Sequence, residues 1–171
     1  MIQRLGACVA DASTAKARRT LSSDFRQGGY RLALKQLADA NRTCPSFRGY
    51  TRLRSSNLLF AGAIAERLIE RDGVAVNREL AKAAGKPAPP TYSVTDGAAM
   101  CVVRSSPDGV AKLFAADVAT PEEQAASAPL QQVMSRCLSG RPVDVTTDGL
   151  RAMLATAAFR SIHAASAAPR S

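Results

Sequence analysis

Apolar residues recur at helical spacing in three segments of the second half of the chain. Each segment opens with residues that favour a helix N-terminus: Ser106 before a proline, Thr120 with Glu123 as a capping box, and Thr147 or Asp148. The sequence therefore predicts three helices after residue 105. Their apolar positions are Val110, Leu113, Phe114 and Val118; then Leu130, Val133, Met134 and Leu138; then Leu150, Met153, Leu154, Ala157, Ala158 and Ile162.

The first half of the chain repeats this helical pattern. Helices are predicted over residues 12–22, 30–41 and 56–71, and Gly73 is placed to end the third of them. In the second half, Pro129 is expected to kink the helix in which it lies.

The remaining segments are shorter or less regular. Residues 74–85 are expected to form a short helix, and 86–95 (KPAPPTYSVT), with three prolines, a semi-rigid connector. The tail 164–171 is small and polar, so we expect it to fray. Only Tyr50–Leu53 and Val143–Val145 have an extended pattern.

The four cysteines have a regular spacing. Cys8 and Cys44 are 36 positions apart, as are Cys101 and Cys137, and one shift of 93 relates the two pairs. An ungapped overlay at this shift matches further identical residues, among them Asp24 with Asp117, Leu37 with Leu130, Arg48 with Arg141 and Arg67 with Arg160. The spacing indicates an internal duplication.

The duplication predicts the architecture. We expect an all-α protein of two similar three-helix units, residues 1–73 and 96–163, joined by 74–95 and followed by the tail 164–171. Each unit alone is marginal in size, so the two are expected to pack together about a pseudo-twofold axis.

The cysteine spacing favours one disulfide within each unit. Metal sites use closely spaced cysteines, and four isolated cysteines with a single histidine lack that pattern, so no metal or cofactor is expected. Pairing of Cys8 with Cys44 and of Cys101 with Cys137 would imply an oxidising compartment. The alternative is four free, buried cysteines in a cytosolic protein. The first ten residues contain no apolar core of a signal peptide, so for an exported protein we expect a signal peptide upstream of Met1 that was removed or is not included.

The second unit contains the motifs C-V-V-R from Cys101, T-P-E-E from Thr120, R-C-L-S-G around Cys137, and D-G-L-R-A-M-L-A-T-A-A-F-R ending at Arg160. With these motifs it resembles a group of exported proteins from sphingomonad-type alphaproteobacteria. The match is looser over residues 8–67. The resemblance implies an exported, helical, cysteine-paired protein and brings no known activity.

Charge is concentrated in the first half. Residues 1–92 contain 16 Lys and Arg against 7 Asp and Glu, whereas residues 93–171 contain 7 of each, so the net charge of +9 belongs to the first half. Such asymmetry indicates an anionic partner or a solvated basic face. The densest basic segment interleaves arginines with aromatics, and its candidate anion or partner-binding residues are Arg42, Arg48, Tyr50, Arg52 and Arg54. The alternative interpretation of this segment is a structural turn.

No catalytic residue is predicted. The chain lacks the standard hydrolase, nucleotide-binding and zinc-protease motifs. We expect Glu66 and Glu70 to pair with nearby arginines or face solvent, Glu123 to complement a helix dipole, and His163 to occupy a helix C-terminus.

Two functions remain at this point. The first is a non-enzymatic periplasmic or secreted binding or scaffold protein, using the basic first unit toward a protein or an anionic envelope component. The second is a cytosolic nucleic-acid-binding protein, although no recognition helix supports it. No segment is long and apolar enough to span a membrane.

Overall fold

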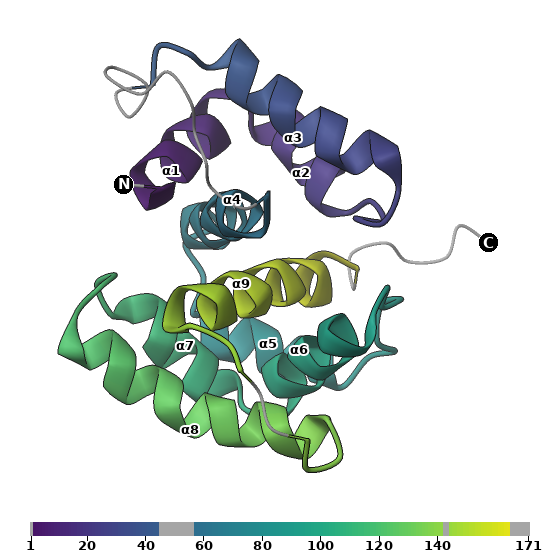
Figure 1. Ribbon diagram of the computed structural model, residues 1–171, viewed down its shortest axis with the longest axis vertical. Coiled ribbons are helices and arrows are strands. Elements are labelled where there is room, and N and C mark those ends of the chain that lie inside the picture. Colours follow the sequence, from purple (N-terminus) through teal and green to yellow (C-terminus); the bar gives the residue numbers. More distant parts are fainter. Residues whose placement is uncertain (1, 45–56, 142–143, 165–171) are drawn as a thin grey trace.

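The structure is a computed structural model, and it describes residues 2–44, 57–141 and 144–164. In these ranges all regular secondary structure is α-helical, as predicted, and there are nine helices (Figure 1). They are α1 (Ile2–Ala12), α2 (Thr14–Leu21), α3 (Gly28–Ala40), α4 (Asn57–Arg71), α5 (Val76–Ala84), α6 (Val94–Ser105), α7 (Pro107–Ala115), α8 (Pro121–Cys137) and α9 (Thr147–Ala164).

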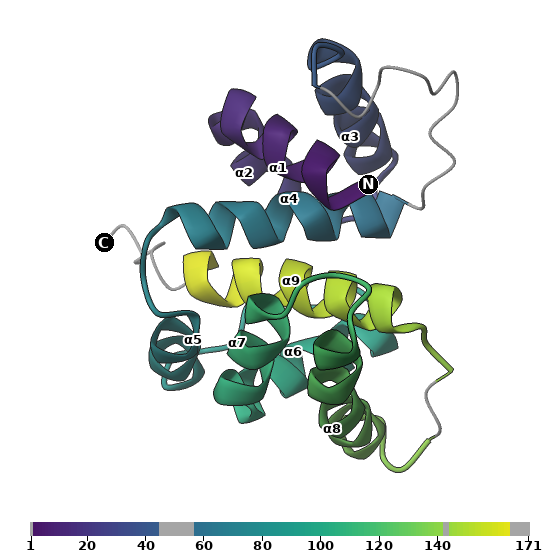
Figure 2. The same cartoon turned by 90° about the vertical axis from the view of Figure 1, so that its left-hand side faces the viewer.

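Helices α4 and α9 form the centre of the molecule. They lie side by side and run in the same direction, with α1–α3 on one side of the pair and α5–α8 on the other (Figure 2). Buried apolar residues of both halves belong to one continuous core. The two halves are therefore packed together, as expected.

The contact between α4 and α9 depends on small residues. A Cβ atom added at Gly62 would lie 2.5 Å from the Cα atom of Ala152, closer than such atoms approach in proteins. Gly6 of α1 is similarly close to Ala63 on another face of α4. Because α4 is crowded on both of these faces, small side chains there let three helices meet at short distance.

Several helix ends follow the sequence signals. The Thr120 side chain accepts a hydrogen bond from the Glu123 backbone N–H at 3.2 Å, which confirms the predicted cap of α8. Gly73 has a φ of +65° just after α4, as a glycine that ends a helix should. Helix α8 continues through Pro129.

Two helices were not predicted, α1 and α6. Each contains the first cysteine of its half, so the halves have four helices each (α1–α4 and α6–α9) rather than three. The N-terminus of α6 lies inside the expected connector, where Ser93 caps the Asp96 N–H at 3.1 Å. The short helix between the halves is confirmed as α5.

Both expected disulfides are present. Cys8 of α1 is bonded to Cys44, just after α3, and Cys101 of α6 is bonded to Cys137, the last residue of α8. The Cα atoms are 5.9 and 6.0 Å apart in the two bridges. Each bridge therefore joins the first and third helices of its half.

Candidate functional site

A groove with aromatic walls opens between the two halves beside the α4–α9 pair. Its volume is about 280 Å³. We call it the aromatic groove, and it is lined by Leu21, Ser23, Phe25, Tyr30, Arg31, Asn57, Leu58, Ala61, Ser93, Thr95, Asp96, Ala99, Met153, Thr156 and Arg160. These residues come from both halves of the chain, so the groove exists only when the halves are packed.

Three aromatic residues gather at this groove, although the chain has only five Phe and three Tyr. Phe25 contacts the edges of both Tyr30 and Tyr92, with ring centroids 6.4 and 5.6 Å apart. The guanidinium groups of Arg26 and Arg160 lie 5.4 and 5.3 Å from the Tyr92 ring centroid. Phe25 is 39% exposed, so this cluster presents an aromatic surface to solvent.

A buried ion pair forms the floor of the aromatic groove. The Arg160 guanidinium donates to the Asp96 carboxylate and to the carbonyl oxygen of Pro90, the latter at 3.1 Å. The other carboxylate oxygen of Asp96 accepts the Tyr92 backbone N–H at 2.8 Å. Both charged groups are thus fully engaged within the protein, as buried charges require.

The side chains of Tyr30 and Arg31 in this groove have no such partner. Among the described residues, no hydrogen bond reaches the Tyr30 hydroxyl and no carboxylate pairs with Arg31. Burial raises the pKa of the Tyr30 phenol to about 12, so it remains a neutral donor at physiological pH.

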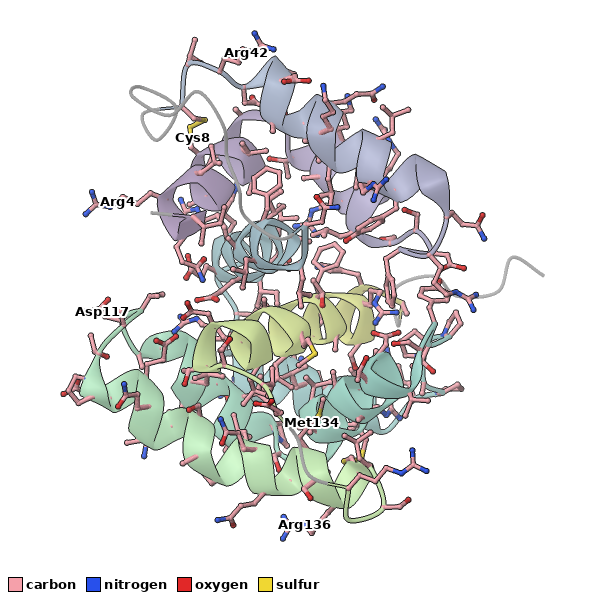
Figure 3. The ribbon with its side chains drawn as sticks, in the orientation of Figure 1. Arg4, Cys8, Arg42, Asp117, Met134 and Arg136 are labelled. Atoms are coloured by element: carbon pink, nitrogen blue, oxygen red, sulfur yellow. A yellow bond between two sulfur atoms is a disulfide. The ribbon has the colours of Figure 1, made fainter. Side chains whose placement is uncertain are left out.

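A second groove lies on the opposite side of the α4–α9 pair, with a volume of about 560 Å³. We call it the polar groove, and it is lined by Gln3, Arg4, Ala7, Ala63, Glu66, Arg67, Glu70, Val76, Ala111, Phe114, Ala115, Ala116, Asp117, Val118 and Arg151. Figure 3 shows Arg4 and Asp117 on this side of the molecule, projecting from α1 and from the loop between α7 and α8.

Arg151 of the polar groove joins three helices. Its guanidinium donates to Glu66 of α4 and to Glu123 of α8, at 2.9 Å from Nε and from Nη1 respectively. It also donates to the carbonyl oxygens of Ala116 and Phe114. All three charged side chains are less than 8% exposed. Burial raises the pKa of the Glu66 carboxyl, and its bonds to Arg151 offset part of that rise.

The shift of 93 that relates the cysteines also relates the two grooves. Seven residues of the aromatic groove correspond to residues of the polar groove at this shift. The pairs are Leu21 with Phe114, Ser23 with Ala116, Phe25 with Val118, Leu58 with Arg151, Asp96 with Gln3, Thr156 with Ala63, and Arg160 with Arg67. The two grooves therefore share seven positions at this shift and differ in the residues found there.

The predicted basic segment falls mostly outside the described residues. Arg48, Tyr50, Arg52 and Arg54 lie there, so their proposed role stays a prediction. Arg42 is exposed beyond the end of α3, where it pairs with Asp39 at 3.1 Å (Figure 3).

Of the roles expected for Glu66 and Glu70, the structure agrees with one and differs from the other. Glu70 pairs with Arg67 at 3.3 Å, as expected. Glu66 does not pair with a neighbour on its own helix or face solvent, which corrects the prediction. Its side chain is on the face of α4 that meets α9, and Arg151 is close only in the folded chain.

His163 lies near the end of α9, as expected, beside Arg18 of α2 and Asp72, which directly follows α4. Its Nε2 atom is 3.1 Å from the Arg18 guanidinium and 3.5 Å from the Asp72 carboxylate. Burial and the positive charge of Arg18 lower the pKa of His163.

Sequence reasoning missed both grooves. The available signal was the scarcity of aromatics: Phe25 and Tyr30 flank a predicted helix start, and Tyr92 lies in the connector. In the overlay at 93, Arg151 falls on Leu58, which marks a charge at a position that is apolar in the other half.

The chain has no match among known protein families, curated protein sequences or solved structures. The two disulfides indicate an oxidising location outside the cytosol. Within the described ranges, no helix has the length and apolar character needed to span a bilayer.

Proposed function

We propose that this protein is a non-enzymatic, exported binding protein of the periplasm or extracellular space, and that it holds its partner in the aromatic groove. The observation that carries the proposal is the cluster of Phe25, Tyr30 and Tyr92 at a groove between the halves. Binding sites are typically apolar and aromatic concavities with a few polar groups that fix orientation. The two disulfides support a location outside the cytosol.

The first half supplies the basic edge of this groove. Arg31, in the first turn of α3, lines the groove, whereas Arg26, just before α3, is paired with Asp24 at 2.8 Å. The positive charge of Arg31 supports an anionic or amphipathic partner rather than a purely apolar one.

An internal duplication accounts for the arrangement of helices. At a shift of 93, the first residues of α1, α2 and α3 fall within one residue of the first residues of α6, α7 and α8, and α4 overlaps α9. The disulfides and the two grooves obey the same shift. We infer that one groove kept or gained a binding role while its counterpart became a structural contact.

Binding of indole to the purified, oxidised protein tests the proposed site. Because the chain has no Trp, the fluorescence of added indole is measured without interference from tryptophan in the protein. Phe25→Ala and Leu58→Ala are expected to weaken binding severalfold. Val118→Ala, at the position equivalent to Phe25, is the matched control and should leave binding unchanged. Absence of indole binding to the wild type, or equal loss in all three variants, contradicts the proposal.

Nucleic-acid binding in the cytosol is the second candidate, favoured by the net charge of +9. It predicts affinity for generic DNA that falls steeply as salt increases. Such binding by the oxidised protein, competing with indole, would replace the first proposal.

A further inference from the structure

The aromatic groove offers a ligand only certain kinds of polar contact. Asp96 and Arg160 are engaged with each other and with backbone groups. The hydroxyls of Ser23 and Thr156 donate to backbone carbonyls of their own helices or the adjoining turn. The groups left to donate to a ligand are the Tyr30 hydroxyl and the Arg31 guanidinium, and the Asn57 amide can both donate and accept. The hydroxyl oxygens of Ser23 and Thr156, whose protons are engaged, can only accept.

The electrostatics of the groove favour a negative charge near these donors. Tyr30 and Arg31 lie in the first turn of α3, and Asn57 is the first residue of α4. The positive ends of two helix dipoles thus add to the charge of Arg31. Asp96, the only carboxylate among the described residues that line the groove, is already neutralised by Arg160.

The rest of the groove is apolar and small. Leu21, Phe25, Leu58 and Met153 supply its apolar wall. A volume of about 280 Å³ is at the lower end of the range for ligand sites, so a compact molecule fits and a long chain does not.

We propose that the aromatic groove binds a small amphipathic carboxylate, an aryl or short alkyl acid. Its apolar body packs against Phe25, Leu58 and Met153, and its carboxylate accepts hydrogen bonds from Arg31 and the Tyr30 hydroxyl. This proposal rests on the proposed binding function and adds to it the class of ligand.

Three probes with one common body test the charge of the ligand. They are 3-phenylpropionate, the neutral 3-phenylpropanamide and the cationic 3-phenylpropylamine, each titrated into the oxidised protein and followed by chemical-shift changes. We expect the acid to bind about tenfold more tightly than the amide, as a charge-assisted hydrogen bond to a guanidinium predicts. The amine is expected to bind most weakly.

Variants then locate the carboxylate. Arg31→Gln should lower the affinity for the acid about three- to tenfold and leave the affinity for the amide unchanged. Tyr30→Phe should lower the affinity for the acid by a smaller factor. Arg19→Gln removes an equal charge from an exposed site on α2 outside the groove, and is the matched control. It should have no effect.

The outcomes separate this inference from the proposed function. If the amide binds as tightly as the acid and Arg31→Gln changes nothing, the ligand is not an anion, and the binding function survives. If Arg19→Gln lowers the affinity for the acid as much as Arg31→Gln does, the acid binds through the net charge of the protein, and the proposed contact with Arg31 is wrong. If none of the three probes binds, and indole also fails, both proposals are wrong.

Discussion

The aromatic groove and the polar groove lie on the two sides of the α4–α9 pair and share seven lining positions at the shift of 93, yet their charged groups have different partners. In the polar groove, Arg151 lies where the aromatic groove has Leu58, and it uses its hydrogen bonds to join α9 to α4 and α8. In the aromatic groove, Tyr30 and Arg31 make no such bonds among the described residues. The comparison teaches that buried charges can join helices in one groove, while the other groove leaves polar groups open to the partner we propose for it.

The largest expected effect is the loss of Arg151. Arg151→Leu, which introduces the residue found at position 58, leaves Glu66 and Glu123 buried without their cation. The free energy of unfolding, measured by urea denaturation, is expected to fall by about 3–5 kcal/mol. Arg67→Gln disrupts an exposed pair with Asp11 and should cost about 1 kcal/mol or less.

A second variant keeps the Arg151 test informative. Adding Glu66→Gln and Glu123→Gln to Arg151→Leu removes the unpaired charges and should recover a substantial part of the loss. If Arg151→Leu is as mild as Arg67→Gln, the polar groove is not a structural contact and the contrast between the grooves disappears.

The two disulfides provide a symmetric test. Each closes a loop of the same length, with a sequence separation of 36 in both. Replacing Cys8 and Cys44 by Ala, or Cys101 and Cys137 by Ala, should each lower the free energy of unfolding by about 2–4 kcal/mol, and by similar amounts. A much larger loss for one pair would show that the two halves do not contribute equally to stability.

The close approach of α4 to α9 determines whether both grooves form. Gly62→Val places side-chain atoms against Ala152, so α4 and α9 must move apart, and we expect a loss of about 1–3 kcal/mol together with weaker indole binding. Gly28→Ala, at a glycine with open space around it, is the control and should change little. Unchanged stability and binding in Gly62→Val would contradict the close packing.

The smallest effect is expected from pH. Because the folded protein lowers the pKa of His163 below its ordinary value of 6.5, the unfolded chain binds a proton more readily. Stability should therefore decrease as pH falls through 6.5 toward the lowered pKa, as measured by Tm. His163→Gln should remove this part of the pH dependence, and a dependence that persists in the variant must come from other groups. At the shift of 93, Glu70 in the first half corresponds to His163.

The sequence predicted the fold class because helical periodicity can be recognised from residues that are close along the chain. It predicted the disulfides because equal cysteine spacing can be found by counting positions. Helices α1 and α6 were missed although each has a usable pattern, such as Leu5 with Val9, and Ser93 with Asp96. The small residues of α6 give it weak periodicity, and α6 begins inside the expected proline-rich connector.

The grooves were beyond prediction for a different reason. Tyr30 and Asp96 are far apart in sequence, and only the packing of α4 on α9 brings their helices to one groove. Likewise, Glu66 and Arg151 are separated by 85 positions, so an interpretation based on neighbours along one helix assigned the wrong partner.

The order in which the cysteines pair has a consequence for biogenesis. Four cysteines can pair in three ways, and here each pairs with its nearest neighbour along the chain. If the chain enters an oxidising compartment with its N-terminus first, Cys44 is the first thiol that Cys8 meets, and Cys101 later meets Cys137. The native bonds can then form by oxidation in order of arrival, without an isomerase to reshuffle them.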